Sequence, residues 1–131
     1  MATVADVMTK GALSVEPTAS IGEAAEKMVA AGVGAILVVE DFVRIIGIVT
    51  ERDILRAAAQ RARAAEARVR QWMTPEVVTI EPETEISEAA RIMFENNFRH
   101  LPVVKDGRPL GIVSLRRLSQ YEFEHAPTPA Q

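Results

Sequence analysis

The chain has 131 residues, of which 48% are hydrophobic and 25% are charged, and its formal net charge is −3. This composition is ordinary for a globular protein, and the acidic balance gives no net attraction to nucleic acid or to an anionic membrane. The chain contains no cysteine, which excludes disulfides, thiol nucleophiles and cysteine-based zinc sites.

The first elements are a short strand and an amphipathic helix. A strand is predicted at residues 14–15, where the following Glu16-Pro17 stops it. From Ile21, apolar residues recur at i, i+3, i+4 and i+7, which predicts one buried helix face. Ser20 with Glu23 matches a capping box. Gly32 suits the left-handed residue that ends a helix, so we expect the helix to stop there.

Two apolar strands and a second helix follow. Residues 35–39 and 45–50 are strand-length apolar runs around a turn, and both faces of this hairpin should be buried. The second helix should begin at Thr50. The alanine- and arginine-rich residues 56–68 predict that it continues to the end of this run.

The second half of the chain repeats the first in the same order. The methionines at 8 and 73 and the prolines at 17 and 82 lie 65 residues apart, and the glycines at 47 and 111 lie 64 apart because the first hairpin has one extra residue. Asn97 aligns with Gly32, and a second helix should start at Ser114. We therefore predict an α/β (α+β) fold of two pseudo-symmetric βαββα motifs, residues 1–66 and 67–121, packed through their sheets, with a flexible tail at 122–131.

The corner at residues 47–54 has the chemistry of a polar binding site. Gly47 permits close approach of a neighbouring chain or a ligand, and the helix start after Thr50 favours an anion. Asp53, one turn on, has a carboxylate that can accept hydrogen bonds from both hydroxyls of a ribose. The alternative is that Thr50 and Asp53 only cap the helix.

The second corner changes the charge. Ser114 keeps the hydroxyl, but Arg117 replaces the acid and accepts no hydrogen bond. We favour a degenerate second cleft, and the alternative is that Arg117 binds a phosphate or a partner's carboxylate.

The complete order of motifs resembles a tandem pair of CBS domains, also called a Bateman module. The motifs are "VMT", "EP", "EAA…M", "PVV" and "GIVT" or "GIVS", and the resemblance covers about residues 4–120. It implies a stand-alone regulatory pair that forms a homodimer and acts in trans on an unidentified regulated protein. It also implies a regulatory adenosine ligand in the clefts, namely AMP, ADP, ATP, NAD(H) or S-adenosylmethionine, with AMP or ATP expected first.

The resemblance also implies which residues form each cleft. For the intact cleft these are Ile48, Thr50, Asp53, Thr79, Arg99 and His100. For the second, degenerate cleft they are Ser14, Gly34, Ala35, Ser114 and Arg117. The alternatives are a solvated side chain for Arg99 and a structural histidine for His100.

Other functions are less well supported by the sequence. No catalytic motif is visible and there are only two histidines, so we expect neither an enzyme nor a metal site. No apolar run approaches the ~20 residues that span a bilayer, and no signal peptide is visible, which favours a cytoplasmic protein without membrane contact. Arginines at 56–70 form a basic segment, but its acidic neighbours argue against nucleic acid as a partner. A dimeric interaction protein with vestigial clefts is the alternative function.

Overall fold

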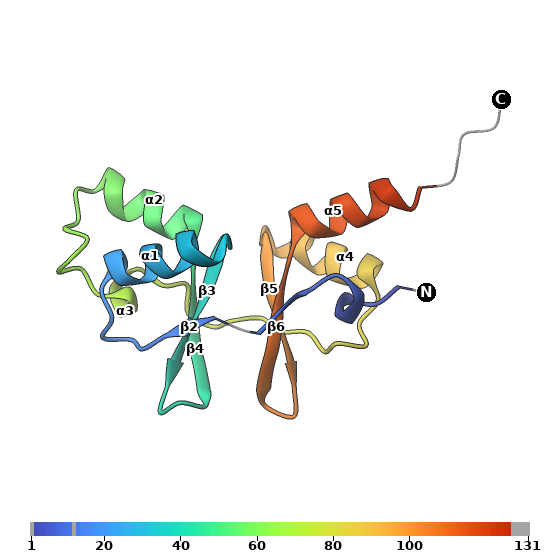
Figure 1. The fold of residues 1–131 in the computed structure, drawn as a ribbon, viewed down its shortest axis with the longest axis horizontal. Coiled ribbons are helices and arrows are strands. Elements are labelled where there is room, and N and C mark those ends of the chain that lie inside the picture. Colours follow the sequence, from blue (N-terminus) through green and yellow to red (C-terminus); the bar gives the residue numbers. More distant parts are fainter. Residues whose placement is uncertain (1, 12, 127–131) are drawn as a thin grey trace.

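The computed structural model describes residues 2–11 and 13–126 and contains two sheets flanked by helices (Figure 1). The helices are α1 (Ile21–Ala31), α2 (Glu51–Ala59), α3 (Val69–Trp72), α4 (Ile86–Asn96) and α5 (Leu115–Glu124), with a 3₁₀ turn at Val4–Asp6. The strands are β1 (Thr9–Lys10), β2 (Ser14–Val15), β3 (Ala35–Glu40), β4 (Arg44–Thr50), β5 (His100–Lys105) and β6 (Arg108–Ser114). The predicted α/β class is thus confirmed.

The helix ends show why the repeat is so regular. Gly32 (φ 66°) and Asn97 (φ 57°) both adopt the left-handed conformation and donate their N–H groups back to α1 and α4. Ser20 accepts a hydrogen bond from the Glu23 N–H at the start of α1. At the place in the second copy that corresponds to β2, Ile80 forms an isolated parallel bridge with Val103. Both copies therefore share the helix–hairpin frame.

The two halves exchange their leading segments. β1 pairs with β6 of the second half, and Val4 and Val7 are buried in that half's core, beside α4. Conversely, Val69 of α3 is buried in the core of the first half. The sequence-based boundary at residue 66 therefore follows the repeat but not the packing: each half is completed by a segment that the repeat assigns to the other.

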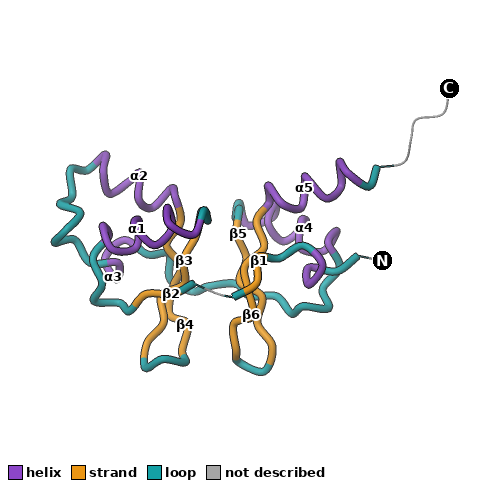
Figure 2. Tube along the Cα trace, viewed as in Figure 1, coloured by secondary structure: helices purple, strands orange, loops and turns teal. Residues whose placement is uncertain are grey.

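The sheets meet in the middle of the molecule, with the helices on their outer sides (Figure 2). Ile36, Val38 and Val49 pack under α1 and α2, whereas Leu37 and Ile48 face the other half and contact Ile112 of β6. Both faces of the β3–β4 hairpin are therefore buried, as alternation along a strand requires. The two halves therefore pack against each other through their sheets, as predicted.

The second helix is shorter than predicted. α2 ends at Ala59, Arg61 takes a positive φ of 61°, and the chain turns back toward α1. There the carbonyls of Ala64 and Ala67 accept hydrogen bonds from the N–H groups of Gly22 and Ile21. Tertiary hydrogen bonds have overridden the high helix propensity of this segment.

The last helix is longer than predicted. α5 reaches Glu124, inside the segment expected to be a tail, and His125 stacks on Tyr121 with ring centroids 3.9 Å apart. The rest of that tail, residues 127–131, lies outside the described residues. Within residues 2–11 and 13–126, no helix has the length and apolar character needed to cross a membrane.

Candidate ligand clefts between the two halves

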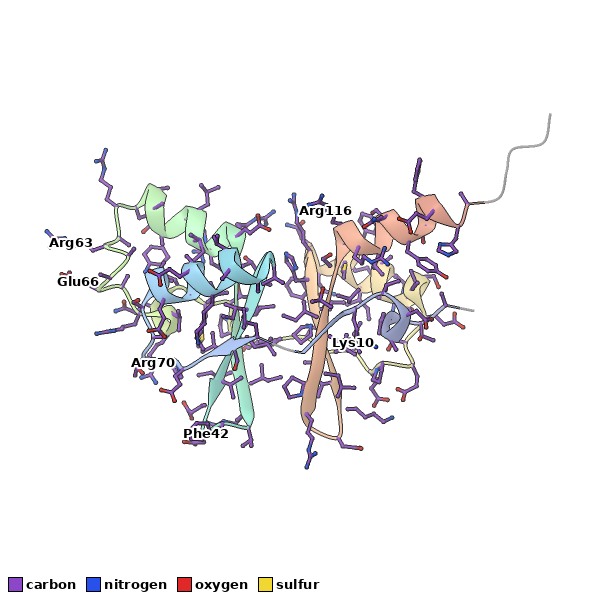
Figure 3. All side chains as sticks on the ribbon, in the orientation of Figure 1. Lys10, Phe42, Arg63, Glu66, Arg70 and Arg116 are labelled. Atoms are coloured by element: carbon purple, nitrogen blue, oxygen red, sulfur yellow. The ribbon has the colours of Figure 1, made fainter. Side chains whose placement is uncertain are left out.

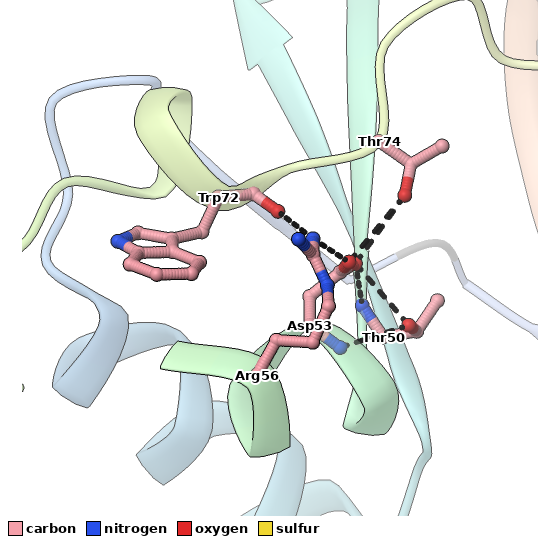
Figure 4. A network of polar contacts seen from close by, with 5 residues as sticks. All are labelled: Thr50, Asp53, Arg56, Trp72 and Thr74. Carbon is pink, nitrogen blue, oxygen red and sulfur yellow. Dashed lines mark hydrogen bonds and ion pairs between the residues drawn. The ribbon is translucent and has the colours of Figure 1, made fainter. Parts of the chain in front are cut away.

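Asp53 is buried, with 3% of the residue exposed. Its carboxylate lies at the centre of a network of polar contacts (Figure 4). Its Oδ2 accepts from the Thr50 N–H at 2.9 Å and lies 3.2 Å from Thr50 Oγ1, while the Asp53 N–H donates to Thr50 Oγ1. Arg56 donates to Asp53 Oδ1 at 2.8 Å and to the Trp72 carbonyl at 3.2 Å. Thr74 Oγ1 lies 3.5 Å from both carboxylate oxygens. Thr50 and Asp53 therefore form the capping box of α2, as the alternative interpretation predicted.

Cleft A lies beside this network and has a volume of about 170 Å³. The corner of β4 and α2 forms one wall, and the segment before β5 forms the other. Thr50 and Thr74 belong both to the Asp53 network and to the lining. Asp53 itself lies behind the lining, and the 3.5 Å that separates it from Thr74 Oγ1 is a long distance for a hydroxyl donor. The lining of cleft A is Ile48, Thr50, Glu51, Arg52, Thr74, Glu76, Val77, Val78, Asn97, Phe98, Arg99 and His100.

Cleft B is the pseudo-symmetric counterpart and is larger, about 970 Å³. The repeat offset relates Thr50 of cleft A to Ser114 of cleft B, and Arg52 to Arg116. Glu51, Arg99 and His100 line both clefts, so the two cavities are neighbours that share one polar wall. Cleft A is the smaller of the two, but it alone has the buried carboxylate of Asp53 behind its lining.

The structure brings together most of the residues predicted for the two clefts. Ile48, Thr50, Arg99 and His100 line cleft A, and Gly34, Ala35 and Ser114 line cleft B. Asp53 lies directly behind the cleft A lining rather than in it.

Three predicted residues lie elsewhere. Thr79 is exposed and is absent from the lining of cleft A, where its neighbour Val78 takes the place expected for it. Ser14 is likewise exposed and borders a separate hollow near Phe42, on the other side of the short β2. Arg117 is half-buried and is absent from the lining of cleft B, which contains Arg116 instead. In each case a residue adjacent in the sequence lines the cleft instead of the predicted one.

Glu51 is the main cleft residue that the sequence reasoning missed. Its carboxylate lies over Gly34, where a Cβ would come within 2.1 Å of Glu51 Oε1 and 3.2 Å of His100 Cε1. Burial lowers the pKa of His100, the nearby Glu51 raises it and Arg99 lowers it further. The available signal was the glycine itself, which leaves room for these two side chains.

Gly47 and Gly111 serve the chain rather than a ligand. A Cβ on Gly111 would lie 2.2 Å from the Thr9 carbonyl oxygen, and one on Gly47 would lie 2.4 Å from Met73 Sδ. These glycines admit the exchanged segments where they cross β6 and β4. Among the described residues, no group of three or more histidine, aspartate or glutamate side chains is placed to hold a metal ion.

The family model for the CBS domain matches residues 4–60 and 69–124. An uncharacterized 17.7 kDa protein of Acidianus ambivalens is 39% identical over 118 residues, which cover 89% of this chain and 71% of that protein. Some relatives are longer: the match spans 62% of an uncharacterized protein of Methanopyrus kandleri. The family match thus covers both copies of the repeat.

Two solved structures have the same architecture. A CBS-domain containing protein of Agrobacterium tumefaciens superposes with a TM-score of 0.84 at 32% identity, covering 92% of this chain and 99% of that chain. The CBS domain pair of protein MJ0100, in complex with 5′-methylthioadenosine and S-adenosyl-L-methionine, gives a TM-score of 0.86 at 26% identity, with 95% and 98% coverage. Similarity to both structures extends over nearly the whole chain.

Proposed function

The chain belongs to the CBS domain family as a tandem pair, and on this premise we propose that it is a regulatory module that binds an adenosine-containing ligand in cleft A. The observation that carries the proposal is the position of Asp53, a buried carboxylate whose two threonine neighbours line that cleft. The solved pair with bound 5′-methylthioadenosine and S-adenosyl-L-methionine supports the ligand class.

The ribose of the ligand would replace the weakest contact of the Asp53 network. Its hydroxyls can donate to the carboxylate in place of Thr74, whose hydroxyl lies at 3.5 Å, while the 2.9 Å bond from the Thr50 N–H keeps the helix start intact. Arg52, Arg99 and His100 line the same cleft and can meet phosphate groups, so AMP and ATP remain the first candidates. Because cleft A holds only about 170 Å³, smaller than most ligand pockets, its exposed side chains must move aside on binding.

The proposal includes a homodimer that acts on a partner protein in trans. Val29 of α1 and Phe94 of α4 occupy aligned positions and are 81% and 74% exposed, and Leu55 of α2 is 70% exposed. Apolar side chains at equivalent positions on the helices of both halves favour burial against a second copy. Ligand binding between the halves would change how these helices are presented to that copy and to the regulated protein. We propose no catalytic step.

Thermal and chemical denaturation with AMP, ADP, ATP, NADH and S-adenosylmethionine tests the proposal. A ligand at 100 times its Kd should raise the free energy of unfolding by about 2.7 kcal/mol. Asp53→Asn should remove most of this gain, because the neutral amide still caps α2 but no longer offers two acceptor oxygens. Arg117→Ala is the control and should keep the gain. The absence of a shift with every adenosine compound at millimolar concentration would refute the sensor function.

The second candidate function is a ligand-independent dimeric interaction protein. The exposed apolar residues on the helices of both halves support it without requiring a ligand. Sedimentation of the protein with and without AMP or ATP separates the two functions. A dimer whose shape and stability are unchanged by every adenosine compound would favour the interaction protein.

A further inference from the structure

We propose that cleft B is a second binding site with a different specificity, for a small organic anion that has an apolar body, a phosphate or carboxylate head and no ribose. The proposal goes beyond the nucleotide site in cleft A and does not depend on it. It rests on three properties of the cavity, namely its apolar walls, its cationic side chains and the missing counterpart of the Asp53 carboxylate.

The walls of cleft B are apolar and come from both halves. Met28, Val33 and Ile54 line it from the first half, and Ile112 and Leu115 line it from the second. The volume of about 970 Å³ lies within the range of pockets that hold small organic ligands. An inorganic ion would leave these walls wet, whereas a ligand with an apolar body would remove them from water.

The polar side chains of cleft B favour a negative head group. Arg99 and His100 reach it from the start of β5, and Arg116 reaches it from the first turn of α5, where Figure 3 labels it. Glu51 is the only carboxylate residue that lines this cleft in the described part of the chain. Leaving His100 aside, cleft B therefore has two cations and one anion.

Cleft A differs from cleft B in the charge of its lining and in the residue at its corner. Its lining has two cations, Arg52 and Arg99, and two anions, Glu51 and Glu76, so its formal charge balances. Its corner also holds Asp53, whose counterpart Arg117 donates its backbone N–H to Ser114 Oγ at 3.1 Å and has a guanidinium that accepts no hydrogen bond. Cleft B thus lacks, at position 117, the carboxylate that Asp53 provides beside cleft A, and its lining favours an anion over a nucleoside.

The test uses 1-naphthyl phosphate as the probe, with its intrinsic fluorescence as the signal, and the full chain without nucleotide. 1-Naphthoate distinguishes a carboxylate head from a phosphate head, while 1-naphthol and inorganic phosphate supply the body and the head separately. We expect the intact anions to bind at least tenfold more tightly than either part. Equal affinity for 1-naphthol, or no binding of either organic anion at millimolar concentration, would overturn the proposal.

Arg116 and Arg52 form a matched pair that locates the probe. They occupy aligned positions, both are exposed, and each lines only one of the two clefts. Arg116→Ala should weaken 1-naphthyl phosphate binding about tenfold, the equivalent of about 1.4 kcal/mol, and Arg52→Ala should change it less than twofold. Equal losses, or a larger loss in Arg52→Ala, would place the probe in cleft A and refute the assignment.

Asp53→Asn separates this proposal from the proposed function. It should remove most of the stabilisation by adenosine compounds and leave the affinity for 1-naphthyl phosphate unchanged. If the protein binds the probe but no adenosine compound, the proposed function fails and the cleft B site stands. If Asp53→Asn also abolishes probe binding while the protein stays folded, the cleft B site fails.

Discussion

Replacing Asp53 by alanine should destabilise the protein even when no ligand is present. The substitution removes the acceptor of the Thr50 N–H at 2.9 Å and the ionic partner of Arg56 at 2.8 Å. Because Asp53 is only 3% exposed, water does not readily replace the lost acceptor. The first turn of α2 thereby loses half of its capping box.

The size of the effect follows from these contacts. A hydrogen bond to a charged acceptor is worth about 1.5–3 kcal/mol. The ion pair adds about 0.2–1 kcal/mol, since the Arg56 side chain is half exposed and solvent screens it. Alanine recovers up to about 0.7 kcal/mol through its higher helix propensity. We therefore expect a net loss of about 2 kcal/mol in the free energy of unfolding.

Urea denaturation followed by circular dichroism measures this loss, with Arg117→Ala as the matched control at the aligned position. The Arg117 side chain makes no hydrogen bond or ion pair with the described residues, and its backbone bond to Ser114 survives the substitution. The control should therefore stay within about 0.5 kcal/mol of the parent protein. A loss below 1 kcal/mol for Asp53→Ala, or equal losses in both variants, would show that the carboxylate network does not stabilise the corner.

Three further predictions concern the fold. Gly111→Ala should lower the free energy of unfolding by about 2–3 kcal/mol, because the new Cβ meets the backbone oxygen of Thr9. Gly47→Ala should lower it less, because the nearest atoms belong to a flexible methionine. Equal losses in urea denaturation would contradict this difference. Phe42→Gly should raise the melting temperature, since Phe42 is 91% exposed and has φ 64°, which costs a side-chain-bearing residue about 1–2 kcal/mol; a lower melting temperature would show that Phe42 packs. Burial lowers the pKa of His100, so the unfolded chain binds more protons than the folded one, and the free energy of unfolding should fall as the pH drops below about 6.5 toward the folded-state pKa. His100→Gln should flatten this pH dependence, measured by denaturation between about pH 5 and pH 8. An unchanged slope of unfolding free energy against pH would contradict the prediction.

The elements were predictable where local signals and the repeat agreed. Gly32 and Asn97 end their helices as expected, because a left-handed residue is a local requirement of the C-terminus. The end of α2 was not predictable from propensity, because it is decided by hydrogen bonds that the N–H groups at the start of α1 donate to the carbonyls of residues 64 and 67. The exchange of Val4 and Val69 between the halves was also hidden, since alignment of the repeat shows which residues correspond but not which sheet each one joins.

The clefts were predictable in position and less so in detail. The resemblance to CBS pairs assigned Thr50, Arg99 and His100 to one cleft, and all three line cleft A. Thr79 and Arg117 were assigned one residue away from Val78 and Arg116, which line the cavities. Such a shift depends on how each element is rotated in the tertiary structure, because the next side chain points to the opposite face in a strand and about 100° around the axis in a helix.

Because of the exchanged segments, cutting or truncating the chain at the linker between the copies would leave two incomplete halves. A fragment ending at residue 66 would lack Val69 from its core and would leave its own Val4 and Val7 with nothing to cover. A fragment beginning at residue 67 would lack the strand that covers the edge of β6. The linker is therefore a poor place to insert a foreign domain or to separate the copies, and we expect both halves to unfold in one transition.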